Sequence, residues 1–154
     1  MRRRTPIRYI AAMVRPAEPL STRLAPSRLA LHAEGLAAVV GASLAIRLLP
    51  FPRTVAPGRR AATRRAGAAE IARLRSLVKL WCGRVPWRAK CFESAVALRT
   101  LLRRRGVAST LHYGMAMRGE LSAHVWLSVD GVTVIGGEVD GYKEVASFPP
   151  AATR

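Results

Sequence analysis

The chain has 154 residues, half of them hydrophobic, which suits a single domain with its own core. Its 26 lysines and arginines face only nine acidic residues, and the formal net charge of +17 indicates an acidic partner. The chain holds three Trp, three Tyr and three Phe and none of the common nucleic-acid-binding motifs, so nucleic acid is not the expected partner.

The charge is unevenly distributed along the chain. Residues 1–65 carry +11, residues 66–110 carry +8 and residues 111–154 carry −2, which together give +17. The basic surface is therefore expected on the N-terminal part of the protein, and the C-terminal part is slightly acidic.

The N-terminal part is predicted to hold one long helix. Residues 1–27 mix proline, arginine and small residues and are expected to be loosely ordered. Ser27 is a suitable N-cap for a helix over residues 28–49, and this helix with its linker forms a first segment, 28–67. Its uncharged stretch, 35–46, is shorter than the roughly 20 residues that span a membrane, so we expect no transmembrane segment and a cytoplasmic bacterial protein.

Residues 68–154 are predicted to form the core domain, which begins with two helices. Apolar side chains recur at helical spacing over residues 68–82. A second amphipathic helix runs from Cys91 to Arg105, with Gly106 as its C′ residue and three arginines at the negative end of the helix dipole. Cys91 therefore stands where a helix begins.

Alternation with period two then predicts a small antiparallel sheet. The predicted strands cover residues 109–117, 123–129, 132–135 and 142–148. Asp130-Gly131 is a strong signal for a two-residue hairpin turn between the second and third strands. Helices followed by a small antiparallel sheet define an α+β fold.

The candidate catalytic residues are Cys91 and His124. The partial positive charge and free N–H groups of a helix N-terminus favour a thiolate, and an imidazole on a neighbouring strand is a base that activates it. An oxyanion hole is expected from the backbone N–H of Cys91 with a donor from Trp87 or Arg88. Cys82 lacks the paired ligands of a zinc site and is interpreted as a buried apolar residue, so no metal or cofactor is expected.

A third group should orient the imidazole of His124. A two-residue turn places His124 opposite Gly137, so the orienting group is expected near position 136 or 137, and both positions are glycines. The nearest carboxylate, Glu138, points to the other face unless a bulge turns it inward, and a backbone carbonyl or a water is the alternative. Asp130 lies in the turn, about 20 Å from His124, and is too far away.

Several segments together resemble the lasso peptide biosynthesis B2 proteins, which are transglutaminase-like cysteine proteases. The segments are PWRAKC (86–91), ALRTLLRRRGV (97–107), Gly114, AHVWLSVDG (123–131) and, upstream, LAIRLLPF (44–51). The resemblance covers the chain from about residue 28 and implies a papain/transglutaminase-like fold, with Cys91 as nucleophile and His124 as base. The chain departs from the family pattern where Gly136 takes the place of the triad aspartate and where Lys90 replaces a small hydroxyl residue.

The resemblance also implies a reaction and partners. B2 proteins remove the leader from a ribosomally made precursor; a separate small protein binds the leader, and a lasso cyclase then closes the macrolactam on the released core. Because the N-terminal region is predicted to be helical, without a recognition domain, we expect a stand-alone leader peptidase that needs the separate protein.

Two alternatives stay open from the sequence. A transglutaminase-like acyl transferase would use the same dyad with an amine as acceptor instead of water. A non-enzymatic basic binding protein would hold Cys91 as a buried, inert thiol. His112 and His32 have no comparable context and are interpreted as structural or exposed.

Overall fold

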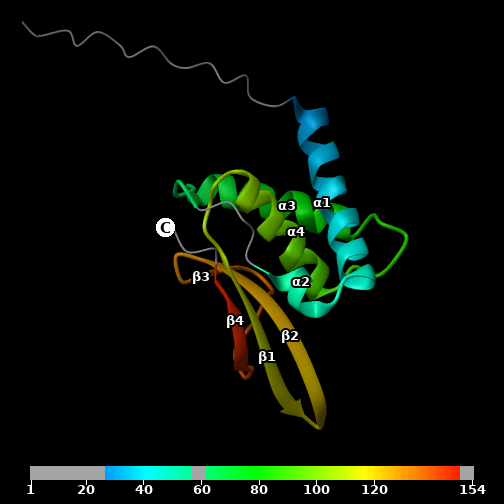
Figure 1. The fold of residues 1–154 in the computed structure, drawn as a ribbon, viewed down its shortest axis with the longest axis vertical. Helices are drawn as coiled ribbons and strands as arrows, with labels where there is room; N and C mark the ends of the chain where they lie inside the picture. Colours follow the sequence, from blue (N-terminus) through cyan, green and yellow to red (C-terminus); the bar gives the residue numbers. More distant parts are fainter. Residues whose placement is uncertain (1–26, 57–61, 150–154) are drawn as a thin grey trace, which may run out of the picture.

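The order of elements is the predicted one, with helices first and strands after them. The structure is a computed structural model, and it describes residues 27–56 and 62–149. The elements are α1 (Arg28–Leu48), α2 (Phe51–Val55), α3 (Ala68–Cys82), α4 (Cys91–Arg104), β1 (Thr110–Arg118), β2 (Glu120–Val129), β3 (Val132–Ile135) and β4 (Lys143–Phe148). Figure 1 shows the helices gathered at one end of the sheet, which confirms the α+β class.

The helix boundaries follow the capping signals in the sequence. The Ser27 hydroxyl accepts a hydrogen bond from the N–H of Ala30 at 3.2 Å, which confirms Ser27 as the N-cap of α1. At the end of α4, Gly106 has a φ of +71° and its N–H donates to Arg103, while the next N–H donates to Leu102. This pair of bonds is a Schellman motif, which needs a left-handed residue at C′ and therefore favours glycine.

The short helix α2 was not expected from the sequence, which predicted a linker after the first helix. Its second residue is Pro52, and proline is tolerated in the first turn of a helix, where its missing N–H leaves no partner unsatisfied. A Pro-Phe-Pro sequence therefore both ends α1 and starts α2. The expectation for residues 1–27 lies almost entirely outside the described residues.

The four strands form one antiparallel sheet in the order β3-β2-β1-β4. Asp130 and Gly131 both have positive φ, +48° and +79°, so the predicted two-residue turn is formed, and Val129 pairs with Val132. A register shift follows between Leu127 and Ser128, and β3 ends at Ile135. The predicted pairing of His124 with position 137 is therefore wrong.

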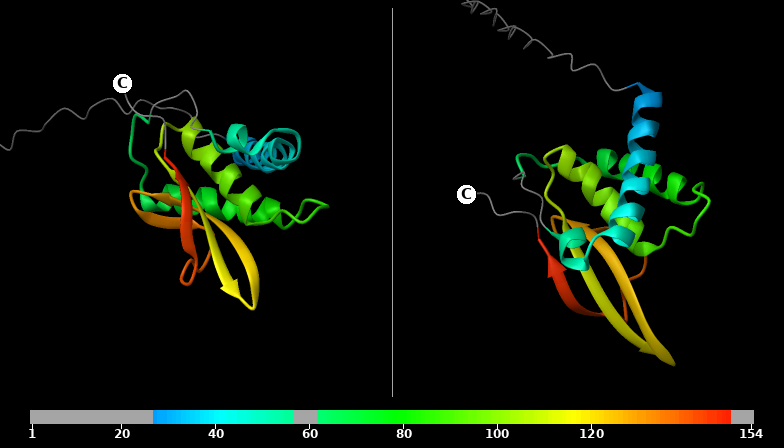
Figure 2. Two further views of the ribbon diagram at one scale, coloured as in Figure 1. Left: turned by 60° about the horizontal axis from the view of Figure 1, so that its bottom comes forward. Right: turned by 45° about the vertical axis from the view of Figure 1, so that its right-hand side comes forward.

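The core lies where α4 packs against α1, α3 and β2. Leu98, Leu101 and Leu102 of α4 are fully buried together with Val39 of α1 and Val78 of α3. Figure 2 shows α4 beside α1 and α3 at the helical end of the sheet. Burial of these aliphatic side chains at about 25 cal/mol per Å² fixes α4, and hence its N-terminus, against the sheet.

The two faces of β2 have different surroundings. Val125 and Leu127 belong to the core that contains the leucines of α4. His124 and Trp126 alternate with them and therefore lie on the other face, which the segment between β3 and β4 crosses. This alternation decides which side chains of β2 can reach α4.

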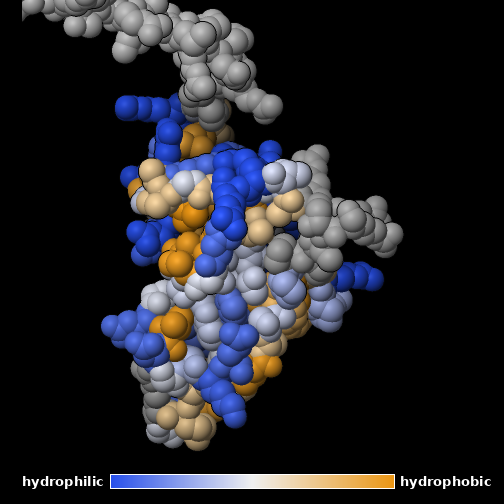
Figure 3. Space-filling view, turned by 90° about the vertical axis from the view of Figure 1, so that its left-hand side faces the viewer, coloured by the Kyte–Doolittle hydropathy of each residue, from blue (hydrophilic) through white to orange (hydrophobic). Residues whose placement is uncertain are grey.

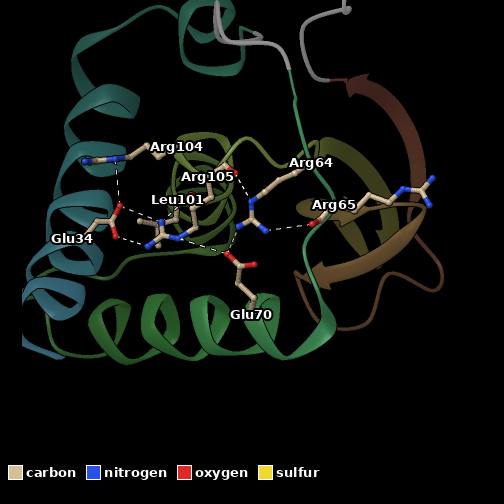
Figure 4. Close-up of polar contacts among 7 residues, drawn as sticks. All are labelled: Glu34, Arg64, Arg65, Glu70, Leu101, Arg104 and Arg105. Atoms are coloured by element: carbon tan, nitrogen blue, oxygen red, sulfur yellow. Dashed lines mark hydrogen bonds and ion pairs between the residues drawn. The ribbon is translucent and has the colours of Figure 1, made fainter. Parts of the chain in front are cut away.

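An ion-pair network joins α1, α3 and the end of α4 (Figure 4). Arg105 donates to both carboxylate oxygens of Glu34, at 3.2 and 2.6 Å, and to the carbonyl of Leu101 at 3.0 Å. Arg64 binds Glu70 at 2.5 Å and the carbonyl of Arg105 at 2.9 Å. The network uses the acidic residues of α1 and α3 to fix the end of α4.

In the described part of the chain, α1 is a helix long and apolar enough to cross a membrane by length and composition. This is weak evidence, because core helices of soluble proteins pass the same test, and Leu31 and Val39 of α1 are buried in the core here. Figure 3 shows one side of the molecule, where hydrophilic side chains separate hydrophobic patches. The absence of a membrane span stays a prediction.

Candidate active site

Cys91 is the first residue of α4, as predicted. The N–H of the preceding residue, Lys90, donates to the carboxylate of Glu93 at 2.9 Å, which is the glutamate half of a capping box. The hydroxyl of Ser94 donates to the carbonyl of Cys91 at 2.9 Å. The side chain of Cys91 is half-buried and packs against the core, so the thiol stands at an ordered helix N-terminus that is not sealed from solvent.

The loop before Cys91 is attached to α1 through Trp87. The indole N–H of Trp87 donates to the hydroxyl of Ser43 at 2.9 Å, and the guanidinium of Arg47 lies 5.7 Å from the centre of the same ring. This bond uses the indole N–H, so that atom is not free to serve an oxyanion hole. The backbone N–H of Cys91 lies in the first turn of α4, where helix N–H groups have no intrahelical partner.

His124 is held by a backbone carbonyl. Its Nε2 lies 2.5 Å from the carbonyl oxygen of Gly136. A carbonyl oxygen only accepts, so Nε2 carries the proton, and Nδ1 of the neutral ring holds the free lone pair. The orienting group comes from position 136, within the region expected from the sequence, and it is the main chain rather than a carboxylate.

Gly136 reaches this position because it has no side chain. Its φ is +123°, and an added Cβ would lie 2.8 Å from the Cα of Trp126 and closer still to its Cβ. The chain leaving β3 therefore passes directly over β2 and brings its carbonyl to His124. A residue with a side chain, such as aspartate, has no room in this path.

The structure does not bring Cys91 and His124 into contact. His124 lies with Trp126 and Tyr142, at ring-centre distances of 6.1 and 4.9 Å, on the face of β2 turned away from the core. Among the described residues, the hydrogen bond of its ring is the one to Gly136, and the thiol of Cys91 has none. The dyad therefore stays a prediction.

The two carboxylates considered for the third role lie elsewhere. Glu138 is exposed in the segment after β3, and within the described parts of the chain it makes no hydrogen bond to His124. The bulge that could turn Glu138 inward was expected at the Gly-Gly pair, 136–137; the observed register shift lies earlier in β3, where Leu127 pairs with Ile135 and Ser128 with Thr133. Asp130 lies in the turn, as expected, 4.0 Å from the exposed guanidinium of Arg65.

A second histidine makes a hydrogen-bonded chain that sequence reasoning missed. Nδ1 of His112 lies 2.8 Å from the carboxylate of Glu144, and Nε2 lies 2.7 Å from the hydroxyl of Ser128. The ring stacks on Trp126, with centres 5.3 Å apart. Alternation along the hairpin places His112 and Ser128 on one face, but the glutamate comes from β4, whose register the sequence did not fix.

Cys82 is half-buried at the end of α3, where it packs against the core. Burial raises the pKa of the Cys82 thiol, and the nearby charge of Glu93 adds to the effect. Both causes keep the thiol protonated at neutral pH. This environment agrees with the interpretation of Cys82 as a structural residue, although its burial is partial.

The described residues contain no cluster of three or more His, Cys, Asp or Glu that could hold a metal ion. Three cavities lined by described residues have volumes of about 340, 360 and 440 Å³, and none of these three is lined by Cys91 or His124.

The helices, the antiparallel sheet and the cysteine at the start of α4 define an α+β fold of the kind used by cysteine-dependent catalysts. A family profile described as the transglutaminase-like superfamily matches residues 36–148. The chain belongs to this superfamily, whose members are generally cysteine-dependent enzymes. No curated protein and no solved structure matches the chain significantly.

Proposed function

We propose that this protein is a cytoplasmic cysteine peptidase that cleaves the leader from a lasso peptide precursor, with Cys91 as nucleophile and His124 as general base. The observation that carries the proposal is the placement of Cys91 as the first residue of α4 in a transglutaminase-like chain. The segments around both residues resemble those of lasso peptide B2 proteins, and this resemblance supports the substrate class.

The reaction follows from the chemistry of the two groups. The imidazole takes the proton of the Cys91 thiol, and Sγ attacks the carbonyl carbon of the scissile peptide bond. The C–N bond then breaks, and the imidazolium gives its proton to the leaving amine. Water attacks the resulting thioester, the carboxylate product leaves, and the thiol is restored.

The hydrogen bonds of the two strand histidines favour His124 as the base. The proton of its ring lies on Nε2, toward Gly136, which leaves Nδ1 available to take a proton. Both ring nitrogens of His112 already have partners in Glu144 and Ser128. This reaction requires that the part of β2 that carries His124 changes conformation when substrate binds, because the ring here lies on the face of β2 turned away from the core against which Cys91 packs.

Acyl transfer is the second candidate function, because the superfamily match covers the whole proposed site without specifying the acceptor. A thioester on Cys91 reacts with an amine as readily as with water if an amine is bound beside it. Products in the presence of a small primary amine distinguish the two: hydrolysis leaves a free carboxylate, and transfer leaves an amide.

The test is mass spectrometry of a candidate precursor incubated with this protein and its recognition partner. We expect cleavage at one leader–core bond by the wild type, and no cleavage by Cys91→Ala or His124→Ala. Cys82→Ala, at the other free cysteine, is the matched control and should cleave normally. Cleavage by Cys91→Ala would refute the proposed nucleophile, and cleavage by His124→Ala alone would refute the proposed base.

A further inference from the structure

A cavity of about 360 Å³ lies between α1, α2 and α4, and four arginines line its α2 and α4 sides. The arginines are Arg53 of α2 and Arg99, Arg103 and Arg104 of α4. The α1 side is lined by small residues, mainly alanines and Gly41, so the helix surface between the guanidinium groups is open and apolar. We call this cavity the arginine groove.

The acidic residues of the described helical part already have partners. Glu34 binds Arg105 and, at 3.4 Å, Arg104; Glu70 binds Arg64 at 2.5 Å (Figure 4). Glu93 accepts a hydrogen bond from the backbone at the start of α4. Among the described residues, no carboxylate pairs with the other three arginines of the groove.

Arg99 is the clearest case of an arginine without a carboxylate partner, because only 7% of the residue is exposed. Its guanidinium donates to three backbone carbonyls, those of Val55 at 2.9 Å and of Phe148 and Pro149 at 3.1 Å. Burial lowers the pKa of Arg99, and the charge of Arg103 lowers it further. Carbonyls satisfy its N–H groups but do not neutralise its charge, so an anion in the groove would stabilise the whole cluster.

We propose that the arginine groove binds the carboxylates of an acidic peptide segment. Arginine forks match carboxylates in a bidentate geometry, and the alanine wall accommodates the methylene groups of glutamate and aspartate. None of the residues lining the groove is aromatic, so it lacks the stacking surface that single-stranded nucleic acid uses. This inference extends the proposed function by giving the precursor or its recognition protein a docking place, but it does not depend on cleavage.

The test measures binding in the Cys91→Ala protein, so that binding is observed even if the proposed peptidase activity is wrong. The probe is a fluorescein-labelled, acetylated peptide of alternating glutamate and alanine, followed by fluorescence anisotropy, with a glutamine–alanine peptide as its neutral counterpart. Arg53→Gln with Arg103→Gln should weaken binding of the acidic peptide about tenfold or more. Arg73→Gln with Arg75→Gln removes the same charge from exposed positions of α3 and should have a much smaller effect.

A steric variant tests the groove without changing its charge. An added Cβ at Gly41 meets nothing within 4 Å, so Gly41→Met fits the helix and places its side chain in the groove. It should weaken binding as the arginine variants do, while Gly41→Ala should bind normally. Equal losses in the two arginine pairs, or tighter binding of a single-stranded oligonucleotide than of the acidic peptide, would overturn the proposal.

Discussion

Substitution of Gly136 by alanine should disturb both the stability of the fold and the orientation of His124. A side chain at this φ of +123° costs about 1–3 kcal/mol in backbone strain. The new Cβ would also lie against the backbone of Trp126, and the segment must move to relieve this contact. Loss of the hydrogen bond between Gly136 and His124 adds about 1 kcal/mol.

These effects together predict a loss of about 3 kcal/mol in the free energy of unfolding, or about 6–12 °C in Tm for a chain of this size. The assay is thermal unfolding followed by circular dichroism, with NMR of the ring nitrogens of His124 as a second readout. The wild type should show the tautomer with the proton on Nε2, and Gly136→Ala should show a mixture of tautomers.

Gly137→Ala is the matched control, because Gly137 also has a positive φ, +71°, but nothing lies within 4 Å of an added Cβ. Backbone strain alone predicts a loss of about 1–2 kcal/mol there. If both variants unfold at the same temperature and Gly136→Ala keeps the proton on Nε2, the close approach to Trp126 does not position the carbonyl, and the reasoning fails.

Three further predictions concern the ion-pair network, the second histidine and the cysteines. A double-mutant cycle of Arg105→Met and Glu34→Gln, measured by urea unfolding, should give a coupling energy of about 1–3 kcal/mol, because both side chains are largely buried. His112→Ala should lower stability by about 1–3 kcal/mol in the same assay, because it leaves a buried serine hydroxyl without its partner. At neutral pH, iodoacetamide should label Cys91 before Cys82. Labelling of Cys82 should accelerate only as the pH rises through the raised pKa of its thiol. Over the same pH range the protein should lose the stability that the protonated form of Cys82 contributes.

Each of these has an outcome that contradicts it. Arg65→Met, at an exposed pair with Asp130, should change the free energy of unfolding by less than about 0.5 kcal/mol. An equally small coupling energy between Arg105 and Glu34 would contradict the importance of the buried pair. An unchanged free energy of unfolding in His112→Ala would mean that water replaces the ring. Labelling of Cys82 at neutral pH as fast as that of Cys91 would contradict the protection of Cys82 by burial. It would also indicate that Cys91 is an ordinary, unactivated thiol.

The sequence by itself determined the elements whose signals are local. Ser27, Gly106 and the Asp130-Gly131 turn bring their own capping and turn chemistry, so the long helices were predicted within one residue and the turn at its observed position, although β2 begins three residues before its predicted start. The position of Cys91 at a helix start belongs to the same group. The helix α2 was missed because Pro52 is compatible with both a break and a beginning.

Only the tertiary structure decided how the strands after the turn meet the candidate site. The register shift in β3, the passage of Gly136 over Trp126 and the pairing of β4 with β1 depend on contacts between segments far apart in the sequence. These contacts gave His124 a carbonyl partner in place of a carboxylate and brought a glutamate of β4 to His112. Local patterns fix the period of a strand, but side-chain packing across the sheet fixes its register, and register selects the partners of each histidine.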